Sequence, residues 1–527
     1  MSSQLDRLPR ALYQAAQVRE LDRIAIEDCR IEGFALMRRA AALAFAALLE
    51  KWPQTRHLLI FVGTGNNGGD GYLLAGLAKE QGLNPELIQV GDHRRLRGDA
   101  LRASEFAARK KVHATPFQRE LLLGTGRYPA GHTVVVDALL GTGLDRSVSG
   151  DFEAAINIIN DLPFPVLAID IPSGLSSDTG NILGVAVQAA LTTTFIGLKQ
   201  GLLTAAGVNV SGAIVYGDLD VPERVFSGSN SPSPAAQRID MQQMSRLLAP
   251  RLRSANKGHF GHTVILGGDY GFGGAALMAA AAALRAGSGL VSVITRSVNR
   301  SGFLASQPEL MVVGTEDPED SQGLAGALLE KASVIVVGPG LGRTEWSREL
   351  LNMALKVQEA REVPLVVDAD GLNLLALRRG SPEEPVTARE NWILTPHPGE
   401  AARLLDCATE EINADRFAAV RQLKERWGGV VLLKGAGSLI CYGPADRRQI
   451  DLCSEGNPGM ASGGMGDILS GLAGGLVAQH YGLENSLRIA VCVHGEAADL
   501  AVQQAGQRGL AATDLLPFIQ KLVNPAR

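Results

Sequence analysis

The 527-residue sequence predicts an α/β protein made of two three-layer αβα domains. In both halves of the chain, short apolar and β-branched runs alternate with longer Ala- and Leu-rich stretches, which is typical of parallel strands covered by helices on both faces. One segment interrupts this pattern at 227–237, SGSNSPSPAAQ, and its Ser, Gly and Pro content indicates a linker. We therefore expect one domain at 1–226 and a second at 238–527.

The composition and charge exclude several kinds of partner. The 50 basic and 55 acidic residues leave a net charge of −5, which argues against a general nucleic-acid or anionic-membrane binder. The start MSSQLDRLPR lacks the apolar core of a signal peptide, and the apolar stretch 275–284 is too short to span a bilayer. The five cysteines are scattered without zinc spacing, as in a reducing compartment. We expect a cytoplasmic protein with neither a nucleic-acid nor a membrane partner.

The first half contains the strand-like runs HLLIFVG, PELIQVG, TVVVDA, PVLAIDI and LTTTFIG. The carboxyl ends of parallel strands meet at one edge of a sheet, where α/β proteins bind ligands. After the first run comes GTGNNGGDG, which formally satisfies GxGxxG, and Asp92 ends the next strand. That fingerprint alone is weak, so an NAD-dependent dehydrogenase is the least favoured function. Two amides and a carboxylate directly before a helix are a less common combination.

Later strand ends in the first half supply Asp137, Asp170 and Ser173. Any one of them could simply cap a helix. Three at the same edge of one sheet favour a site instead. Amide, carboxylate and hydroxyl oxygens together suit a hard cation.

The segment from about Tyr13 to Pro222 resembles the NAD(P)H-hydrate epimerase family, which is Rossmann-like, through GNNGGDG, VDALLGTGL and DIPSG. The resemblance implies that Asn67, Asp137 and Ser173 bind potassium and that Asp170 is the catalytic acid–base. In a hydrated nicotinamide, the C6 hydroxyl could invert by loss of hydroxide or by ring opening, and both routes need a proton shuttle. The implied substrate-binding residues are Asn66, Asn67, Gly68, Gly69, Asp70, Gly141, Thr142, Gly143, Leu144, Asp145, Arg146, Ser147 and Asp170.

Glycine-bearing strand ends accumulate in the second half. HTVILGG, GLVSVIT, SVIVVGPG, PLVVDAD and GVVLLKG read as strands, and a helix is expected from near Gly274 to near Gly287. The absence of GxxxxGK[ST] excludes a P-loop, and the absence of HExxH argues against a zinc hydrolase. Lys434 precedes Gly-Ala-Gly and is expected to reach a phosphate. Asp368 could hold a magnesium–phosphate group or cap a helix, and His397 lies in a stiff turn between prolines.

The stretch GGMGDILSG, 463–471, has a glycine turn that opens into a helix, which is the arrangement of a phosphate cradle. Together with five other segments in matching order, it makes 240–523 resemble the ADP/ATP-dependent NAD(P)H-hydrate dehydratases, relatives of the ribokinase-like kinases. The resemblance implies that Ala275, Gly340, His397 and Asp467 contact the hydrate. The residues implied to bind the adenine nucleotide are Lys434, Gly435, Ala436, Gly437, Ser438 and Gly466.

In ribokinase-like enzymes, the aspartate beside the glycine turn takes the proton of the acceptor hydroxyl during phosphoryl transfer. Asp467 would act in this way on the C6 hydroxyl of the hydrate, with ADP or ATP as donor and magnesium as cofactor. The ring nitrogen could then expel phosphate and restore NAD(P)H. The donor, and any preference between the NADH hydrate (NADHX) and the NADPH hydrate (NADPHX), stay open.

The sequence therefore predicts a combined isomerase and lyase. One half would interconvert the R and S hydrates of NADH and NADPH, and the other would dehydrate the S form. One alternative is a small-molecule kinase, such as a vitamin-precursor kinase, with a nucleotide-sensing N-terminal domain. Another is a dimerisation module like those of messenger-RNA decapping scaffolds, which the complete set of Asn67, Asp137, Asp170 and Ser173 disfavours. Both kinds of domain often self-associate, so we expect a homo-oligomer.

Overall fold

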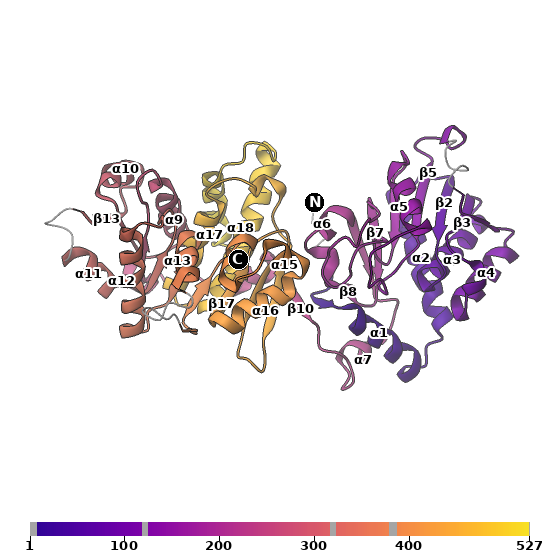
Figure 1. Ribbon diagram of the computed structural model, residues 1–527, viewed down its shortest axis with the longest axis horizontal. Coiled ribbons are helices and arrows are strands. Elements are labelled where there is room, and N and C mark those ends of the chain that lie inside the picture. Colours follow the sequence, from indigo (N-terminus) through magenta and orange to yellow (C-terminus); the bar gives the residue numbers. More distant parts are fainter. Residues whose placement is uncertain (1–7, 119–124, 317–322, 379–386, 526–527) are drawn as a thin grey trace. The chain divides into compact units, whose positions relative to one another are not determined.

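The computed structural model describes residues 8–118, 125–316, 323–378 and 387–525. The chain divides into two compact units, Met1–Gln237 and Arg238–Arg527. In each unit helices cover a predominantly parallel sheet, so the predicted α/β class is confirmed (Figure 1). Among the described residues, no helix combines the length and apolarity needed to cross a membrane.

The N-terminal unit has a seven-stranded parallel sheet in the order β4-β3-β2-β5-β6-β7-β9. Alternate side chains of β2 enter different cores: Leu58, Ile60 and Val62 pack in one cluster, and Leu59 and Phe61 pack in the other. Both faces are therefore covered, which explains why the strand is apolar throughout. The strands are β2 (His57–Val62), β3 (Asn84–Gln89), β4 (Ala114–Pro116), β5 (Thr133–Ala138), β6 (Val166–Ile169), β7 (Leu191–Phe195) and β9 (Ala213–Gly217).

Helices and three short strands complete the N-terminal unit. The helices are α1 (Ala15–Arg23), which continues into a π-helical turn η2 (Ile24–Asp28), α2 (Gly33–Lys51), α3 (Asn66–Glu80), α4 (Gly98–Arg109), α5 (Asp151–Asp161), α6 (Gly207–Val210) and α7 (Arg224–Ser227). The short strand β1 (Ala11–Tyr13) pairs in parallel with β8 (Leu198–Lys199) and antiparallel with β10 (Ala236–Ile239). The end of the segment expected as a linker is ordered structure instead, because β10 begins at Ala236. Ala236 is buried, and its neighbour Ala235 donates a backbone hydrogen bond to Leu12.

The C-terminal sheet has the strand order β13-β12-β11-β14-β15-β16-β17-β18-β19. Its strands are parallel as far as β17, but β18 and β19 are antiparallel to their neighbours. The short glycine turn between β17 and β18 explains this change, since a parallel connection would need a dozen residues or more. The strands are β11 (His262–Leu266), β12 (Leu290–Thr295), β13 (Met311–Gly314), β14 (Val334–Val337), β15 (Leu365–Val367), β16 (Trp392–Leu394), β17 (Val430–Leu433), β18 (Ser438–Tyr442) and β19 (Gln449–Cys453).

Two small-residue helices, α9 and α17, pack closely in the C-terminal unit. A Cβ on Gly471 of α17 would lie 1.9 Å from the carbonyl oxygen of Ala279 of α9, so only glycine permits this approach. Helix α9 ends before Gly287 (φ 100°), as expected. The helices are α8 (Met241–Met244), α9 (Gly273–Ala286), α10 (Arg300–Ser306), α11 (Gly323–Glu330), α12 (Glu345–Arg361), α13 (Ala369–Arg378), α14 (Pro398–Leu405), α15 (Thr409–Ala414), α16 (Arg416–Trp427), α17 (Met465–Ala478), α18 (Leu483–Ala505) and α19 (Leu516–Leu522).

Candidate active sites

The N-terminal unit contains a pocket of about 550 Å³ at the carboxyl ends of its strands. Three of the residues predicted to bind the epimerase substrate do not line this pocket. Gly68 and Gly69 lie inside α3, where a Cβ on Gly68 would come within 2.2 Å of the Gly63 carbonyl oxygen, and Ser147 is exposed outside the pocket. The predicted residues that do line it are Asn66, Asn67, Asp70, Gly141, Thr142, Gly143, Leu144, Asp145, Arg146 and Asp170.

Asp170 follows β6 in a strained backbone conformation, with φ at 69°. A left-handed conformation is uncommon outside glycine and persists only where the surrounding structure imposes it. The Asp170 N–H donates to the carbonyl oxygen of Thr193 on the neighbouring strand, at 2.7 Å. Its carboxylate accepts a hydrogen bond from Lys199 and is 18% exposed. The strand edge therefore presents this carboxylate to the pocket.

Lys199 of β8 is a site residue that the sequence analysis missed. Its side chain is 1% exposed, and its three ammonium hydrogens are accounted for by Asp170, the Thr194 hydroxyl at 3.0 Å and the Phe195 carbonyl at 3.2 Å. A buried ammonium needs such partners. The only signal in the sequence was a lysine directly after the apolar run TTTFIGL.

Two further carboxyl groups share this pocket. Asp22 comes from α1 and Asp70 from α3. Burial raises the pKa of Asp22 to about 6, with Asp170 adding to the shift and Lys199 opposing it. Burial, followed by the charges of Asp170 and Asp22, raises the pKa of Asp70 well above its ordinary value. Sequence analysis missed Asp22, although it lies four residues after the buried Val18 and therefore on the same helix face.

The three residues predicted to bind potassium are linked through Leu140, and Asn67 also lines the pocket. The Ser173 hydroxyl donates to Asp137 at 2.6 Å, and the Ser173 N–H donates to the same carboxylate at 2.8 Å. The Asn67 amide donates to the Leu140 carbonyl at 3.0 Å, and the Leu140 N–H donates to the Ser173 hydroxyl at 2.8 Å. Burial raises the pKa of Asp137 to about 6.

This oxygen cluster fits a hard cation. Among the described residues, Asn67 Oδ1 is a buried acceptor without a hydrogen-bond partner. A bound cation would satisfy that oxygen and would compensate the buried Asp137 charge. Amide, carboxylate and hydroxyl oxygens are suitable ligands for potassium.

In the C-terminal unit, the predicted residues follow parallel strands at one edge of the sheet. The loop after β11 leads to Ala275, and the loop after β14 carries Gly340. A Cβ on Gly340 would lie 3.1 Å from that of Ala275, so these two residues are adjacent. His397 follows β16, and Lys434 follows β17. The fold thus brings segments separated by up to 160 residues to one edge.

Asp467 lies in the first turn of α17, after Gly464 in a left-handed conformation. In the described part of the chain, no hydrogen bond or ion pair fixes its carboxylate. Burial raises the pKa of Asp467 to about 7; the charges of Asp368 and Glu400 add to the shift and that of Lys434 opposes it. A carboxylate with this pKa can take up a proton near neutral pH.

Lys434 is not a surface lysine. Its ammonium lies 2.7 Å from Asp368 Oδ1 and 3.8 Å from Glu400. The other Asp368 oxygen accepts from the Ser470 hydroxyl at 2.5 Å. Although burial opposes ionisation, the Lys434 charge and these hydrogen bonds hold the pKa of Asp368 below its ordinary value. A Cβ on Gly466 would lie 3.4 Å from the Lys434 nitrogen, so the glycine turn of α17 borders this ion pair.

The turn 434–438 is held by a buried arginine that the sequence analysis missed. Arg416 of α16 donates to the carbonyl oxygen of Lys434 at 3.4 Å and to that of Gly437 at 3.2 Å. Gly435 and Gly437 have φ values of 142° and 66°, which favour glycine at both positions. The arginine therefore fixes a backbone shape that only this glycine pattern allows.

His397 caps helix α14. Its ring nitrogen Nδ1 accepts a hydrogen bond from the Gly399 N–H at 3.0 Å. The backbone N–H of His397 donates to the Glu400 carboxylate at 2.8 Å. Burial lowers the pKa of His397, and the Lys434 and Arg403 charges lower it further. The ring is half-exposed, so capping does not remove it from contact with a ligand.

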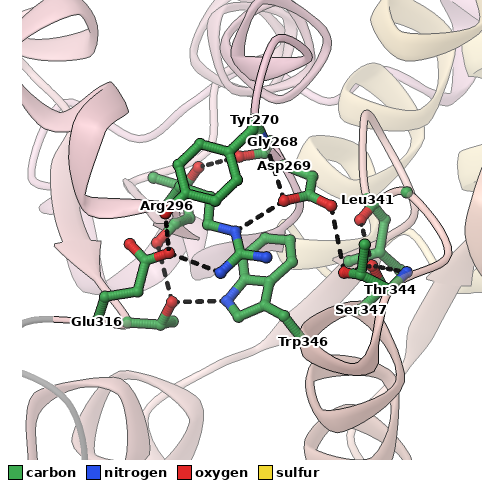
Figure 2. A network of polar contacts seen from close by, with 12 residues as sticks. Gly268, Asp269, Tyr270, Arg296, Glu316, Leu341, Thr344, Trp346 and Ser347 are labelled. Atoms are coloured by element: carbon green, nitrogen blue, oxygen red, sulfur yellow. Dashed lines mark hydrogen bonds and ion pairs between the residues drawn. The ribbon is translucent and has the colours of Figure 1, made fainter.

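A polar network holds the loop that leads to Ala275 (Figure 2). Arg296 donates to Asp269 at 2.7 Å and to Glu316 at 2.6 Å. Its guanidinium lies 4.5 Å from the Tyr270 ring centre and 4.2 Å from that of Trp346, so the two rings enclose it. These contacts tie the loop after β11 to α12 and restrict its motion.

Each unit has glycine turns and carboxylates at the carboxyl ends of parallel strands, which is typical of an α/β enzyme with a candidate ligand site in each unit. A family model described as NAD(P)H-hydrate dehydratase matches residues 263–521, and one described as YjeF-related protein N-terminus matches residues 33–201. The chain is 42% identical to the bifunctional NAD(P)H-hydrate repair enzyme Nnr of Coxiella burnetii, over 98% of this chain and 99% of that protein.

The Escherichia coli enzyme of the same name is 40% identical, over 98% of this chain and 95% of that protein. The ADP/ATP-dependent NAD(P)H-hydrate dehydratase of Bacillus subtilis, co-crystallised with ATP and Mg²⁺, is 25% identical, with a TM-score of 0.45 over 54% of this chain and 95% of that chain. This chain belongs to the family of bifunctional NAD(P)H-hydrate repair enzymes. The resemblance of both halves that the sequence predicted is confirmed.

Proposed function

We propose that this chain repairs hydrated NADH and NADPH. The N-terminal unit interconverts the R and S hydrates, and the C-terminal unit dehydrates the S form with ADP or ATP. The observation that carries this proposal is the similarity to bifunctional repair enzymes over 98% of the chain, which includes both units. We assign the epimerase to 1–226 and the dehydratase to 238–527, close to the division between the two compact units.

In the proposed epimerase site, Asp170 exchanges protons with the C6 hydroxyl or with water. The buried ammonium of Lys199 donates a hydrogen bond to this carboxylate and fixes its position on the pocket wall. The lining of the pocket suits a dinucleotide, because side-chain amides, glycine turns and Arg146 line it together with Asp170. Asn67, Asp137 and Ser173 would hold potassium, which would supply a positive charge to compensate the buried Asp137 carboxylate.

In the proposed dehydratase site, Asp467 accepts the proton of the C6 hydroxyl as that oxygen attacks the terminal phosphorus of the nucleotide. The turn 434–438 and Gly466 offer backbone N–H groups to the phosphates. The ring nitrogen lone pair of the phosphorylated hydrate then expels phosphate and restores the reduced ring. Ala275, Gly340 and His397 would contact the hydrate.

Magnesium supplies charge neutralisation on the nucleotide phosphates when it is bound. Asp368 and Glu400 offer hard oxygen ligands beside Lys434, so the residues present fit this cation. We also propose a cytoplasmic location, in agreement with five free cysteines. Self-association of the chain stays a prediction.

One assay tests the proposed function. Purified protein is incubated with mixed hydrate epimers and magnesium, ADP and ATP are added separately, and the absorbance of reduced cofactor and the released phosphate are followed. Full conversion of both epimers is the expected result. Recovery that stops at the S fraction would contradict the epimerase activity. Accumulation of a stable phosphorylated compound would identify a small-molecule kinase instead.

A further inference from the structure

We propose that Asp22 of α1 is a second catalytic residue of the epimerase, acting as the acid where Asp170 acts as the base. This inference rests on the proposed epimerase function. When C6 is inverted by loss and return of the oxygen, the hydroxyl leaves from one face of the ring and water enters at the other face. A proton must be given at the first face and taken at the second. A single fixed carboxylate reaches only one face.

The pocket supplies the two groups from different elements. Asp170 lies at the end of β6 and contacts Lys199, whereas Asp22 comes from α1. The two carboxyl groups are close enough to affect one another electrostatically. Besides Asp170 and Lys199, the charged groups on the pocket wall are Arg19, Asp70, Asp99, Asp145 and Arg146.

The contacts of each carboxyl group suit its role. The Lys199 ammonium donates a hydrogen bond to Asp170, whose carboxyl group therefore acts as an acceptor in the site. Asp22 is partly buried, and burial raises its pKa to about 6, so it can carry a proton or release one near neutral pH. Burial and the charges of Asp170 and Asp22 raise the pKa of Asp70 well above its ordinary value, which favours the neutral form of this carboxyl group.

The protonated Asp22 gives its proton to the C6 hydroxyl, the C–O bond breaks as the ring nitrogen lone pair forms the N1–C6 double bond, and water leaves. A second water attacks C6 from the opposite face and gives its proton to the Asp170 carboxylate. The nitrogen regains its lone pair, and the opposite epimer results. In the reverse direction the two residues exchange roles. Before a second turnover in the same direction, Asp170 releases its proton to water and Asp22 takes one up from water, so no oxidant or other reactant is needed.

The test is epimer exchange with purified S hydrate in the absence of ADP and ATP, so that dehydration does not occur. We expect Asp22→Asn to slow exchange by about 100- to 10,000-fold, the usual contribution of a general acid, with dehydration of the S hydrate unchanged. Glu20→Gln is the matched control, because Glu20 lies on the same helix, is partly exposed with its carboxylate paired to Arg23, and does not line the pocket. Exchange in Asp22→Asn at the wild-type rate would overturn the proposal.

The pH profile separates catalysis from a structural role. In the wild type, kcat/KM for exchange should fall as the pH rises above about 6, because Asp22 then loses its proton. Asp22→Glu should keep this falling limb and part of the activity, whereas Asp22→Asn should lose the limb. A slow Asp22→Asn enzyme that keeps the limb would show that another group is the acid. In ¹⁸O-labelled water, inversion without uptake of label would also exclude this route.

The controls distinguish this inference from the proposed function. Wild-type protein that exchanges no epimers would contradict the epimerase itself. Normal exchange in Asp22→Asn together with lost exchange in Asp170→Asn would leave the function intact and remove only the role of Asp22.

Discussion

In the N-terminal unit the Asp170 carboxylate lies against a buried ammonium, whereas in the C-terminal unit the Asp467 carboxylate lies among other carboxylates. Both units contain a lysine with little exposure near the predicted catalytic group, with 1% of the Lys199 side chain and 20% of the Lys434 side chain exposed. Lys199 bonds directly to Asp170, but Lys434 bonds to Asp368, 2.7 Å away, and so leaves Asp467 with a raised pKa. The two units thus differ in the partner of the lysine, which is the predicted catalytic carboxylate itself in the N-terminal unit and a neighbouring carboxylate in the C-terminal unit. In the C-terminal unit the Lys434 charge offsets the raised pKa of Asp467 only in part, because burial and the charges of Asp368 and Glu400 act in the other direction.

The largest expected effects come from reciprocal variants that test whether the two sites act separately. Asp467→Asn should slow dehydration by about 100- to 10,000-fold because it removes a general base, and it should leave epimer exchange unchanged. Asp170→Asn should show the opposite pattern. The measurement is the rate of each reaction in both variants. A loss of both activities in either variant, with the fold intact by circular dichroism, would contradict two independent sites.

The next largest effect concerns stability and Lys199. Lys199→Met leaves Asp170 without its ion-pair partner and leaves the Thr194 hydroxyl and the Phe195 carbonyl without their donor. Breaking a buried pair in this way costs about 3–5 kcal/mol, measured as the free energy of urea unfolding of the N-terminal unit. Lys79→Met is the control, since Lys79 is exposed on α3. Equal stability of the two variants would show that the ion pair contributes little.

The smallest expected effect is a pH dependence that distinguishes the two reactions. Because Asp467 must be unprotonated to act as a base, dehydration should slow as the pH falls below about 7, by about tenfold per pH unit. Epimer exchange should instead become slower as the pH rises above about 6 if Asp22 is its acid. Rate profiles of both reactions in one buffer series measure this. A flat dehydration profile from pH 5 to 8 would contradict the role of Asp467.

The pKa of Asp467 also has a consequence for stability. Because the folded-state pKa lies above the ordinary value of an aspartate, the folded state binds this proton more tightly than the unfolded state does. The contribution of this proton to the free energy of unfolding is fully present at pH values below the ordinary aspartate pKa and is lost as the pH rises towards 7. Asp467→Asn should therefore be the more stable form at neutral pH.

Much of the fold could be predicted from local patterns. The apolar runs predicted the main parallel strands, and Gly274–Gly287 was expected as a helix almost as α9 has it. The antiparallel pair β17–β18 was not foreseen, although its short glycine turn allows no other connection. The pocket residues Asp22 and Lys199 and the bracing Arg416 were also missed, because each acts through partners distant in the sequence.

The sequence by itself determined the α/β class, the two units and the family, because strand periodicity and glycine motifs are properties of neighbouring residues. The tertiary structure alone decided that Lys199 meets Asp170, that Lys434 meets Asp368, and that Asp22 shares a pocket with Asp70. The physical reason is that the charge state of a group depends on burial and on nearby charges, and both exist only once distant segments have packed together.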